Sequence, residues 1–166
     1  MKIITWNLKS ASKASRLWKV FSEINPDIAL VQESRDIPEE VSRKYSILAR
    51  MAIYKTGKPQ KFKTAVMVKG KIMGGIDLKS NLGWVNKELE FFKGNFIACK
   101  VELTNRQVFN VISVYSPAWP VDRERLKGVH VSEVKLEGNL DVWATEIIWS
   151  ALKNTDLKGN WIVGGD

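Results

Sequence analysis

The first part of the chain alternates two short apolar runs with one helical pattern. Residues 2–7 and 28–33 are rich in β-formers, and they end on the polar residues Asn7 and Glu33. Between them, apolar side chains recur at spacings of three and four, which is typical of a helix with one buried face: Leu17, Trp18, Val20, Phe21 and Ile24. This order predicts a βαβ unit, in which both strands end at the same edge of the sheet. We therefore expect Asn7 and Glu33 to be neighbours at that edge.

Turn-forming and capping residues set the expected boundaries of the next elements. Ser10 or Ser12 is expected to cap the first helix, and Asn25 and Pro26 to end it. As far as residue 94 we expect, in order, a short helix at 38–44, an extended segment at 45–53, a basic loop at 55–63, a buried strand at 64–68, a weak strand at 71–77 and a loop at 79–94.

The second half of the chain predicts a hairpin, a long connection, a helix and a last strand. Residues 96–103 and 108–115 flank a polar turn and are typical of a β-hairpin. Pro117 and Pro120 follow and prevent further strand pairing. Beyond them we expect a connection without a firm pattern at 120–139, a helix with its apolar stripe at 142–152 capped by Asn139 or Asp141, and a buried strand at 160–163.

The composition fits one globular domain, which we expect to span residues 1–166. Hydrophobic residues make up 45% of the chain and charged residues 27%, as in ordinary globular proteins. The chain has no apolar run of about 18 residues and no secretory signal pattern, so we expect no membrane partner. The single cysteine, Cys99, excludes an internal disulfide, and a cytoplasmic location is the expectation.

The formal net charge of +8 favours an anionic partner, and nucleic acid is the commonest one. Trp119 lies in loop-like sequence, where its ring either stacks on a base or packs beneath the loop. Arg123 follows and is a candidate for contact with a phosphate backbone, although Asp122 and Glu124 dilute the local charge. Substrate contact by Trp119 and Arg123 is thus one interpretation of this connection, and a solvated charged loop is the other.

Four expected strands end on polar groups suited to phosphodiester chemistry: Asn7, Glu33, Tyr115 and Asp166. A carboxylate at a strand end is by itself most often a turn or solvated residue. The set is more informative, because one carboxylate can hold a hard cation such as Mg²⁺ and a second can orient or deprotonate a water. A phenol or an amide can hydrogen-bond the charged transition state.

The same segments resemble the endonuclease/exonuclease/phosphatase superfamily, which includes exonuclease III-like and DNase I-like nucleases and inositol polyphosphate phosphatases. The matching pieces occur in the family's order and span the chain: residues 4–8 (ITWNL), 25–33 (NPDIALVQE), 110–117 (NVISVYSP) and 161–166 (WIVGGD). The tyrosine-x-proline ending at Tyr115 is similar to the abasic-site and retroelement endonuclease branches.

This resemblance implies a fold and a set of roles. The fold would be a four-layer α-β-β-α sandwich, with two mixed β-sheets face to face and helices outside. Glu33 would be a Mg²⁺ ligand, with Mn²⁺ as an alternative metal, and Asn7 would help to place metal and phosphate. Tyr115 would contact the scissile phosphate, and Asp166 would orient or activate the attacking water.

The chain also departs from the family pattern. In the family, Gly-Gly-Asp continues with an aromatic residue and an asparagine, and a later Ser-Asp-His supplies a catalytic histidine. Here Asp166 is the last residue, and His130, the only histidine, lies in the long connection and is expected to be a loop residue. We therefore expect a domain truncated after the Gly-Gly-Asp motif, as a fragment of a longer reading frame or as a natural truncation.

The expected function is Mg²⁺-dependent hydrolysis of phosphodiester bonds by a DNA endonuclease or exonuclease. One alternative is a phosphomonoesterase or phospholipase-like enzyme of the same fold. The other is a non-catalytic nucleic-acid-binding module, because the family's aspartate–histidine pair is missing from the sequence.

Overall fold

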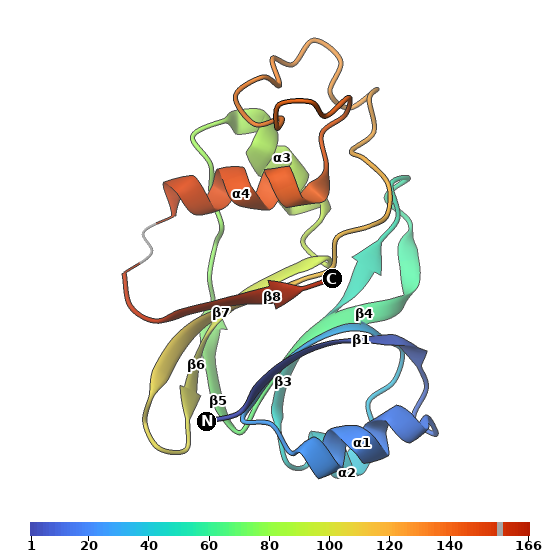
Figure 1. Ribbon diagram of the computed structural model, residues 1–166, viewed down its shortest axis with the longest axis vertical. Helices are drawn as coiled ribbons and strands as arrows, with labels where there is room; N and C mark the ends of the chain where they lie inside the picture. Colours follow the sequence, from blue (N-terminus) through green and yellow to red (C-terminus); the bar gives the residue numbers. More distant parts are fainter. Residues whose placement is uncertain (156–157) are drawn as a thin grey trace.

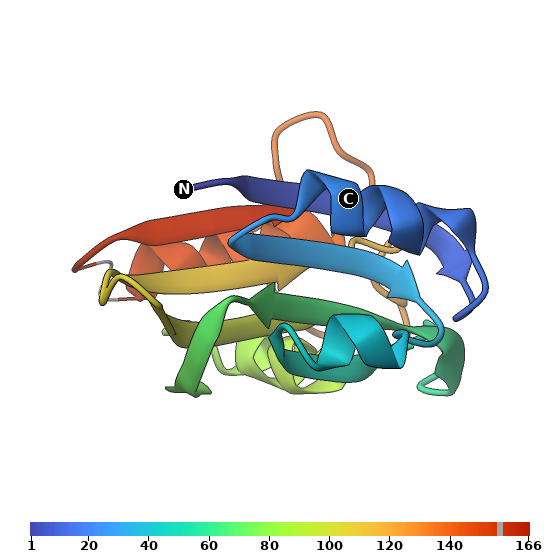
Figure 2. The ribbon, with the colours of Figure 1, turned by 90° about the horizontal axis from the view of Figure 1, so that it is seen from below.

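Two four-stranded sheets, packed face to face between outer helices, make up the fold (Figures 1 and 2). The computed structural model describes residues 1–155 and 158–166. Its elements are, in chain order, β1 (Ile3–Ala11), α1 (Arg16–Ile24), β2 (Ile28–Ser34), α2 (Glu39–Ser42), β3 (Ser46–Ile53), β4 (Pro59–Val68), β5 (Gly70–Gly75), α3 (Gly83–Phe91), β6 (Phe96–Leu103), β7 (Val108–Val114), α4 (Ala144–Asn154) and β8 (Trp161–Gly165).

The first sheet has the strand order β1-β2-β4-β3. β1 and β2 run parallel, as the βαβ pattern predicted, and Asn7 pairs with Gln32 in their register. β4 is antiparallel to both β2 and β3, so the sheet is mixed. Its outer face packs against α1, where Trp18 and Phe21 meet Ala29, Val31 and Met67 in one apolar cluster.

The second sheet has the order β5-β6-β7-β8. β6 is antiparallel to β5 and β7, and β7 runs parallel to β8, which makes this sheet mixed as well. Its outer side is covered by α3, α4 and part of the connection between β7 and α4. Side chains from the inner faces of both sheets fill the central layer: Ile28, Leu30, Val66, Val68, Ile97, Cys99, Val101, Leu103, Phe109 and Val111. The expected four-layer α-β-β-α sandwich is confirmed.

Several boundaries differ from the sequence-based expectation. β1 continues beyond Asn7 to Ala11, and the helix cap is Ser15, whose side chain accepts a hydrogen bond from the Leu17 N–H, rather than Ser10 or Ser12. The end of α1 agrees, because Asn25 adopts the left-handed conformation that terminates helices.

Two of the expected loops were wrong. The basic loop expected at 55–63 gives way to β4 at Pro59, because Gln60 and Phe62 alternate inward between exposed lysines. The segment 79–94 contains α3, which lacks a side-chain cap at Leu82 and is held by its buried Val85 and Leu89. The helix expected over 142–152 begins only at Ala144, and its capping carboxylate is Glu146 rather than Asn139 or Asp141.

Two buried carboxylates hold the long connection between β7 and α4 in place. Glu146 accepts hydrogen bonds from the Leu136 N–H (2.6 Å), the Asn139 side chain (2.9 Å) and the Trp143 N–H (2.6 Å). Glu88 of α3 forms an ion pair with Arg125, whose guanidinium also lies over the Phe91 ring. The connection has no helix or strand, yet it is bonded to both helices that cover the second sheet.

No helix among residues 1–155 and 158–166 is long and apolar enough to span a membrane.

The glycine pair at the end of β8 allows this strand to lie close to the first sheet and to its neighbour β7. A Cβ on Gly164 would lie 3.0 Å from Leu30 Cδ1 and 3.4 Å from Thr5 Cβ, both in the first sheet. A Cβ on Gly165 would lie 1.9 Å from the carbonyl oxygen of Val114, which is a backbone atom. A larger residue at position 165 would push β8 away from β7, whereas one at position 164 would require the Leu30 side chain to shift.

We expect Gly165→Ala to lower the free energy of unfolding by about 2 kcal/mol, because the added methyl group overlaps backbone that cannot move alone. Chemical denaturation followed by circular dichroism would measure this change. Gly74→Ala is the matched control, since nothing lies within 4 Å of its Cβ in edge strand β5. Equal stability of the two variants would contradict the close packing of β8.

Candidate active site

One side-chain amide joins the two carboxylates that the sequence singled out. Asn7 Nδ2 donates to Glu33 Oε1 at 3.1 Å and to Asp166 Oδ2 at 2.6 Å. Asn7 and Glu33 belong to the first sheet, whereas Asp166 follows β8 of the second. The candidate site therefore lies where strand ends from both sheets meet, close to the carboxyl terminus marked in Figure 1.

Irregular backbone places the first-sheet side chains at this edge. The register of β1 and β2 shifts between Asn7 and Ala11, and that of β2 and β4 shifts between Val31 and Ser34. Lys9, Ser10 and Glu33 all have positive φ angles (48°, 60° and 53°), which residues with a Cβ adopt rarely. Bulges of this kind turn a side chain out of the regular alternation. The resulting strain is concentrated beside Asn7 and Glu33, as it often is at functional sites.

Asp166 is held by its backbone at the end of the second sheet. Its N–H donates to the Val114 carbonyl (3.1 Å), and its own carbonyl accepts from the Ser116 N–H (2.7 Å). The parallel pairing of β7 with β8 thus continues for one residue beyond β8. The carboxylate itself is exposed and points towards Asn7, so it can contact solvent and a bound substrate.

Tyr115 is the buried member of the group. Its ring packs edge-on against Phe62, with ring centroids 5.1 Å apart, and its hydroxyl accepts a hydrogen bond from Gln60 Nε2 at 3.4 Å. Burial raises the pKa of this phenol, the Gln60 hydrogen bond lowers it, and the negative charges of Glu33 and Asp166 raise it further. The phenol therefore stays protonated and can donate a hydrogen bond.

The donor set fits a hard cation with few protein ligands. Glu33 offers a partly exposed carboxylate, and Asp166 an exposed one. Among the described residues, no three His, Cys, Asp or Glu side chains are grouped so that they could hold a metal ion. Mg²⁺ often binds through only one or two carboxylates and keeps several waters, so this pair suits it. The Asn7 Oδ1 atom accepts from the Lys9 N–H at 2.8 Å, so Asn7 faces the carboxylates through its NH₂ group.

The other predicted residues lie in the long connection. Trp119 is partly buried and stacks on Tyr54, with ring centroids 5.9 Å apart and planes 20° from parallel. Arg123 is exposed and makes a bidentate ion pair with Asp141 (2.6 and 3.1 Å), so its guanidinium is already engaged. His130 lies in the connection as expected, hydrogen-bonded to Ser132 and 4.0 Å from Glu133.

Sequence reasoning missed the residues that support Tyr115. Gln60 and Phe62 fell in the segment predicted to be a loop, and their inward alternation with Lys61 was the signal that could have revealed a strand. Sequence reasoning also missed that Gln32 connects the two sheets. It is fully buried in β2, and its Nε2 donates across the sandwich to Ser113 Oγ of β7 at 3.1 Å.

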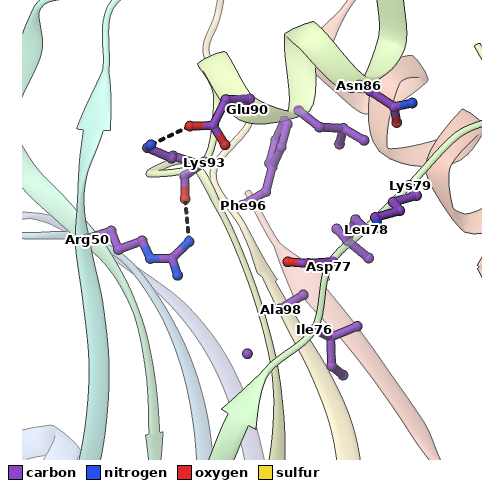
Figure 3. A pocket seen from close by; sticks show the side chains of 12 residues that line it. Arg50, Ile76, Asp77, Leu78, Lys79, Asn86, Glu90, Lys93, Phe96 and Ala98 are labelled. Carbon is purple, nitrogen blue, oxygen red and sulfur yellow. Dashed lines mark hydrogen bonds and ion pairs between the residues drawn. The ribbon is translucent and has the colours of Figure 1, made fainter. Parts of the chain in front are cut away.

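A cavity of about 760 Å³ lies elsewhere, between Arg50 of β3, residues 75–79 and α3 (Figure 3). Arg50 donates to the Lys93 carbonyl at 3.3 Å, and Lys93 pairs with Glu90. The lining of this cavity includes none of the four residues Asn7, Glu33, Tyr115 and Asp166. Size alone does not make it the better candidate.

Comparison with known proteins finds a distant structural likeness. Scans against protein-family models and against curated proteins found no match. Among solved structures, the chain is similar to the AP endonuclease LMAP from Leishmania major, with a TM-score of 0.49 and 14% identity. The alignment covers 99% of this chain and 54% of that one, so the chain spans about half the length of that structure. A likeness this distant does not transfer an activity.

We expect Gln60→Leu to raise the pKa of Tyr115, because the lost hydrogen bond stabilises the phenolate. Glu33→Gln should lower it, because a neighbouring negative charge is removed. Ultraviolet absorbance titration would measure both shifts, with Tyr115→Phe identifying the signal and Tyr45 titrating separately at a pKa of about 12. Gln107→Leu, at an exposed turn, is the control. An unchanged Tyr115 titration in Gln60→Leu would rule out the hydrogen bond.

Proposed function

We propose that this chain carries the core of a Mg²⁺-dependent phosphodiesterase acting on nucleic acid, with DNA as the preferred substrate. The supporting observation is the Asn7 amide that joins the Glu33 and Asp166 carboxylates, with Tyr115 within their electrostatic influence. Two carboxylates, an amide and a neutral phenol are groups that suit the hydrolysis of a phosphodiester. The net charge of +8 favours a polyanionic substrate.

Each residue has a distinct role in this proposal. Glu33 would hold Mg²⁺ or Mn²⁺. The metal would neutralise negative charge on the phosphate and on the leaving oxygen. Asp166 would orient the attacking water and accept its proton, since its carboxylate is exposed. Tyr115 would donate its hydroxyl hydrogen to a phosphate oxygen. Asn7 would hold the two carboxylates at a fixed separation and help to place the phosphate.

Substrate contact by the long connection is part of the same proposal. The Trp119 ring would support bases through its stack with Tyr54. To bind a phosphate group in the same bidentate way, Arg123 would have to exchange Asp141 for it, because its Nε and Nη2 atoms donate to that carboxylate. This exchange would be sensitive to ionic strength, since the ion pair is exposed.

We expect Glu33→Gln to lower the rate of DNA hydrolysis by about 100-fold or more, because a neutral amide binds Mg²⁺ poorly and no longer fixes the phosphate. Excess Mg²⁺ should restore part of the rate, and calorimetry should show weaker Mg²⁺ binding. Asp166→Asn should lower the rate without this rescue. Glu23→Gln, an exposed carboxylate on α1, is the matched control and should leave the rate unchanged.

A non-catalytic nucleic-acid-binding module is the second candidate. The observation that favours it is the net charge of +8, which favours binding of a polyanion whether or not the chain cuts it. If Glu33→Gln and Asp166→Asn both leave hydrolysis within about twofold of the original chain, or if the chain binds DNA without cutting it in Mg²⁺, this candidate replaces the first.

A further inference from the structure

The positive charge of the chain is concentrated in one segment. Residues 41–76 contain nine Lys and Arg residues and no Asp or Glu. Of the 26 basic residues in the sequence, 17 therefore remain for the rest of the chain, against 18 acidic ones. The net charge of +8 thus comes entirely from the segment that contains β3, β4 and β5.

The β3–β4 hairpin presents this charge at its tip and along one strand. Lys55, Lys58 and Lys61 are exposed and Lys63 is partly exposed. Within the part of the chain that the structure describes, none of these four ammonium groups forms an ion pair with a carboxylate. They are therefore available to an external anion. In Figure 1 the hairpin projects beside the connection that follows β7.

The hairpin tip is anchored rather than free. A Cβ on Gly57, which has a φ angle of +80°, would lie 3.4 Å from Phe91 Cε2 of α3, so the turn rests against that ring. The Tyr54 ring, 42% exposed, stacks on Trp119 of the connection. A ligand that binds a pre-formed surface loses less conformational entropy on binding.

The hairpin is directly coupled to the candidate active site. On β4, the inward-facing Gln60 and Phe62 contact Tyr115, while Lys61 and Lys63 alternate with them. Lys63 also pairs with Ser34, the neighbour of Glu33, in the register of β2 and β4. A polyanion held along these lysines would lie close to the carboxylates.

We propose that the β3–β4 hairpin binds a single-stranded segment of nucleic acid, with Lys55, Lys58 and Lys61 on consecutive phosphates and the outer face of Tyr54 stacked on an unpaired base. Lysines beside an aromatic ring are the combination that single-strand binding uses. The bases of a duplex have their faces covered by neighbours, so the Tyr54 ring can be reached only by an unpaired one. This inference deepens the proposed function, but the binding step does not require hydrolysis.

Fluorescence anisotropy of a labelled oligothymidine, in EDTA and over a range of salt, tests the lysines. We expect the triple variant Lys55→Ala/Lys58→Ala/Lys61→Ala to bind more weakly and to reduce the slope of log K against log salt by about 2, since three phosphate contacts on a single strand are lost. Lys13→Ala/Lys19→Ala/Lys87→Ala removes three exposed lysines outside the segment and is the matched control. Equal slopes in the two triple variants would overturn the proposal.

The same assay tests the ring. Tyr54→Ala should weaken binding of the oligothymidine about tenfold, whereas Tyr54→Phe should retain it, because stacking needs the ring and not the hydroxyl. Equal loss of binding to a duplex of the same length would overturn the assignment to single strands. Equal binding of the unaltered chain to phosphatidylserine vesicles would overturn the assignment to nucleic acid. Thermal unfolding checks that each variant folds.

Failure of this inference can be separated from failure of the proposed function. The lysine triple variant should still hydrolyse the small phosphodiester bis(p-nitrophenyl) phosphate at the rate of the unaltered chain. Glu33→Gln should bind the oligothymidine normally and fail to hydrolyse either substrate. If the unaltered chain hydrolyses nothing but the lysine triple still loses binding, the hairpin inference stands without the catalytic one. Loss of small-substrate hydrolysis in the lysine triple would show that it damages the site itself.

Discussion

The close approach of β8 to the β1–β2 pair is the constraint on which the candidate site depends. Asn7 and Asp166 are 159 residues apart in the chain and belong to different sheets, yet their side chains are hydrogen-bonded. This contact requires β8 to lie against Thr5 and Leu30, which a glycine at position 164 permits. The parallel pairings at β1–β2 and β7–β8 then direct both sets of strand ends to one edge.

The candidate site holds two carboxylates near each other, and like charges at short range repel. Their repulsion is moderated because the Asn7 NH₂ group donates to both, and because Asp166 is exposed to water. Such an arrangement attracts a cation or another proton donor, which is the physical basis of the metal proposal. The neutral phenol of Tyr115 beside them is consistent with this polarity, since nearby negative charge opposes its ionisation.

Support for the edge comes from segments that carry no chemistry of their own. Gln60 and Phe62 hold the Tyr115 ring, and the Gln32–Ser113 hydrogen bond links the sheets where both are buried. On the other side, Glu88 and Glu146 hold the long connection against α3 and α4. The Tyr54–Trp119 stack ties that connection to the β3–β4 hairpin. The long connection and the β3–β4 hairpin, which flank the candidate site, are thus each fixed by specific side-chain contacts.

The sequence by itself determined the local elements and the identity of the candidate residues. Apolar periodicity predicted the βαβ unit and the β6–β7 hairpin, and the polar strand ends singled out Asn7, Glu33, Tyr115 and Asp166. The local sequence pattern did not predict α3 or the start of β4, because tertiary packing rather than a cap or an apolar run stabilises them. Only the tertiary structure decided that Asn7 faces both carboxylates through its NH₂ group, that Arg123 is bound to Asp141, and that Gln60 supports Tyr115. The reason is physical: strand periodicity is a property of neighbouring residues, whereas the partner of a side chain depends on how closely distant strands approach.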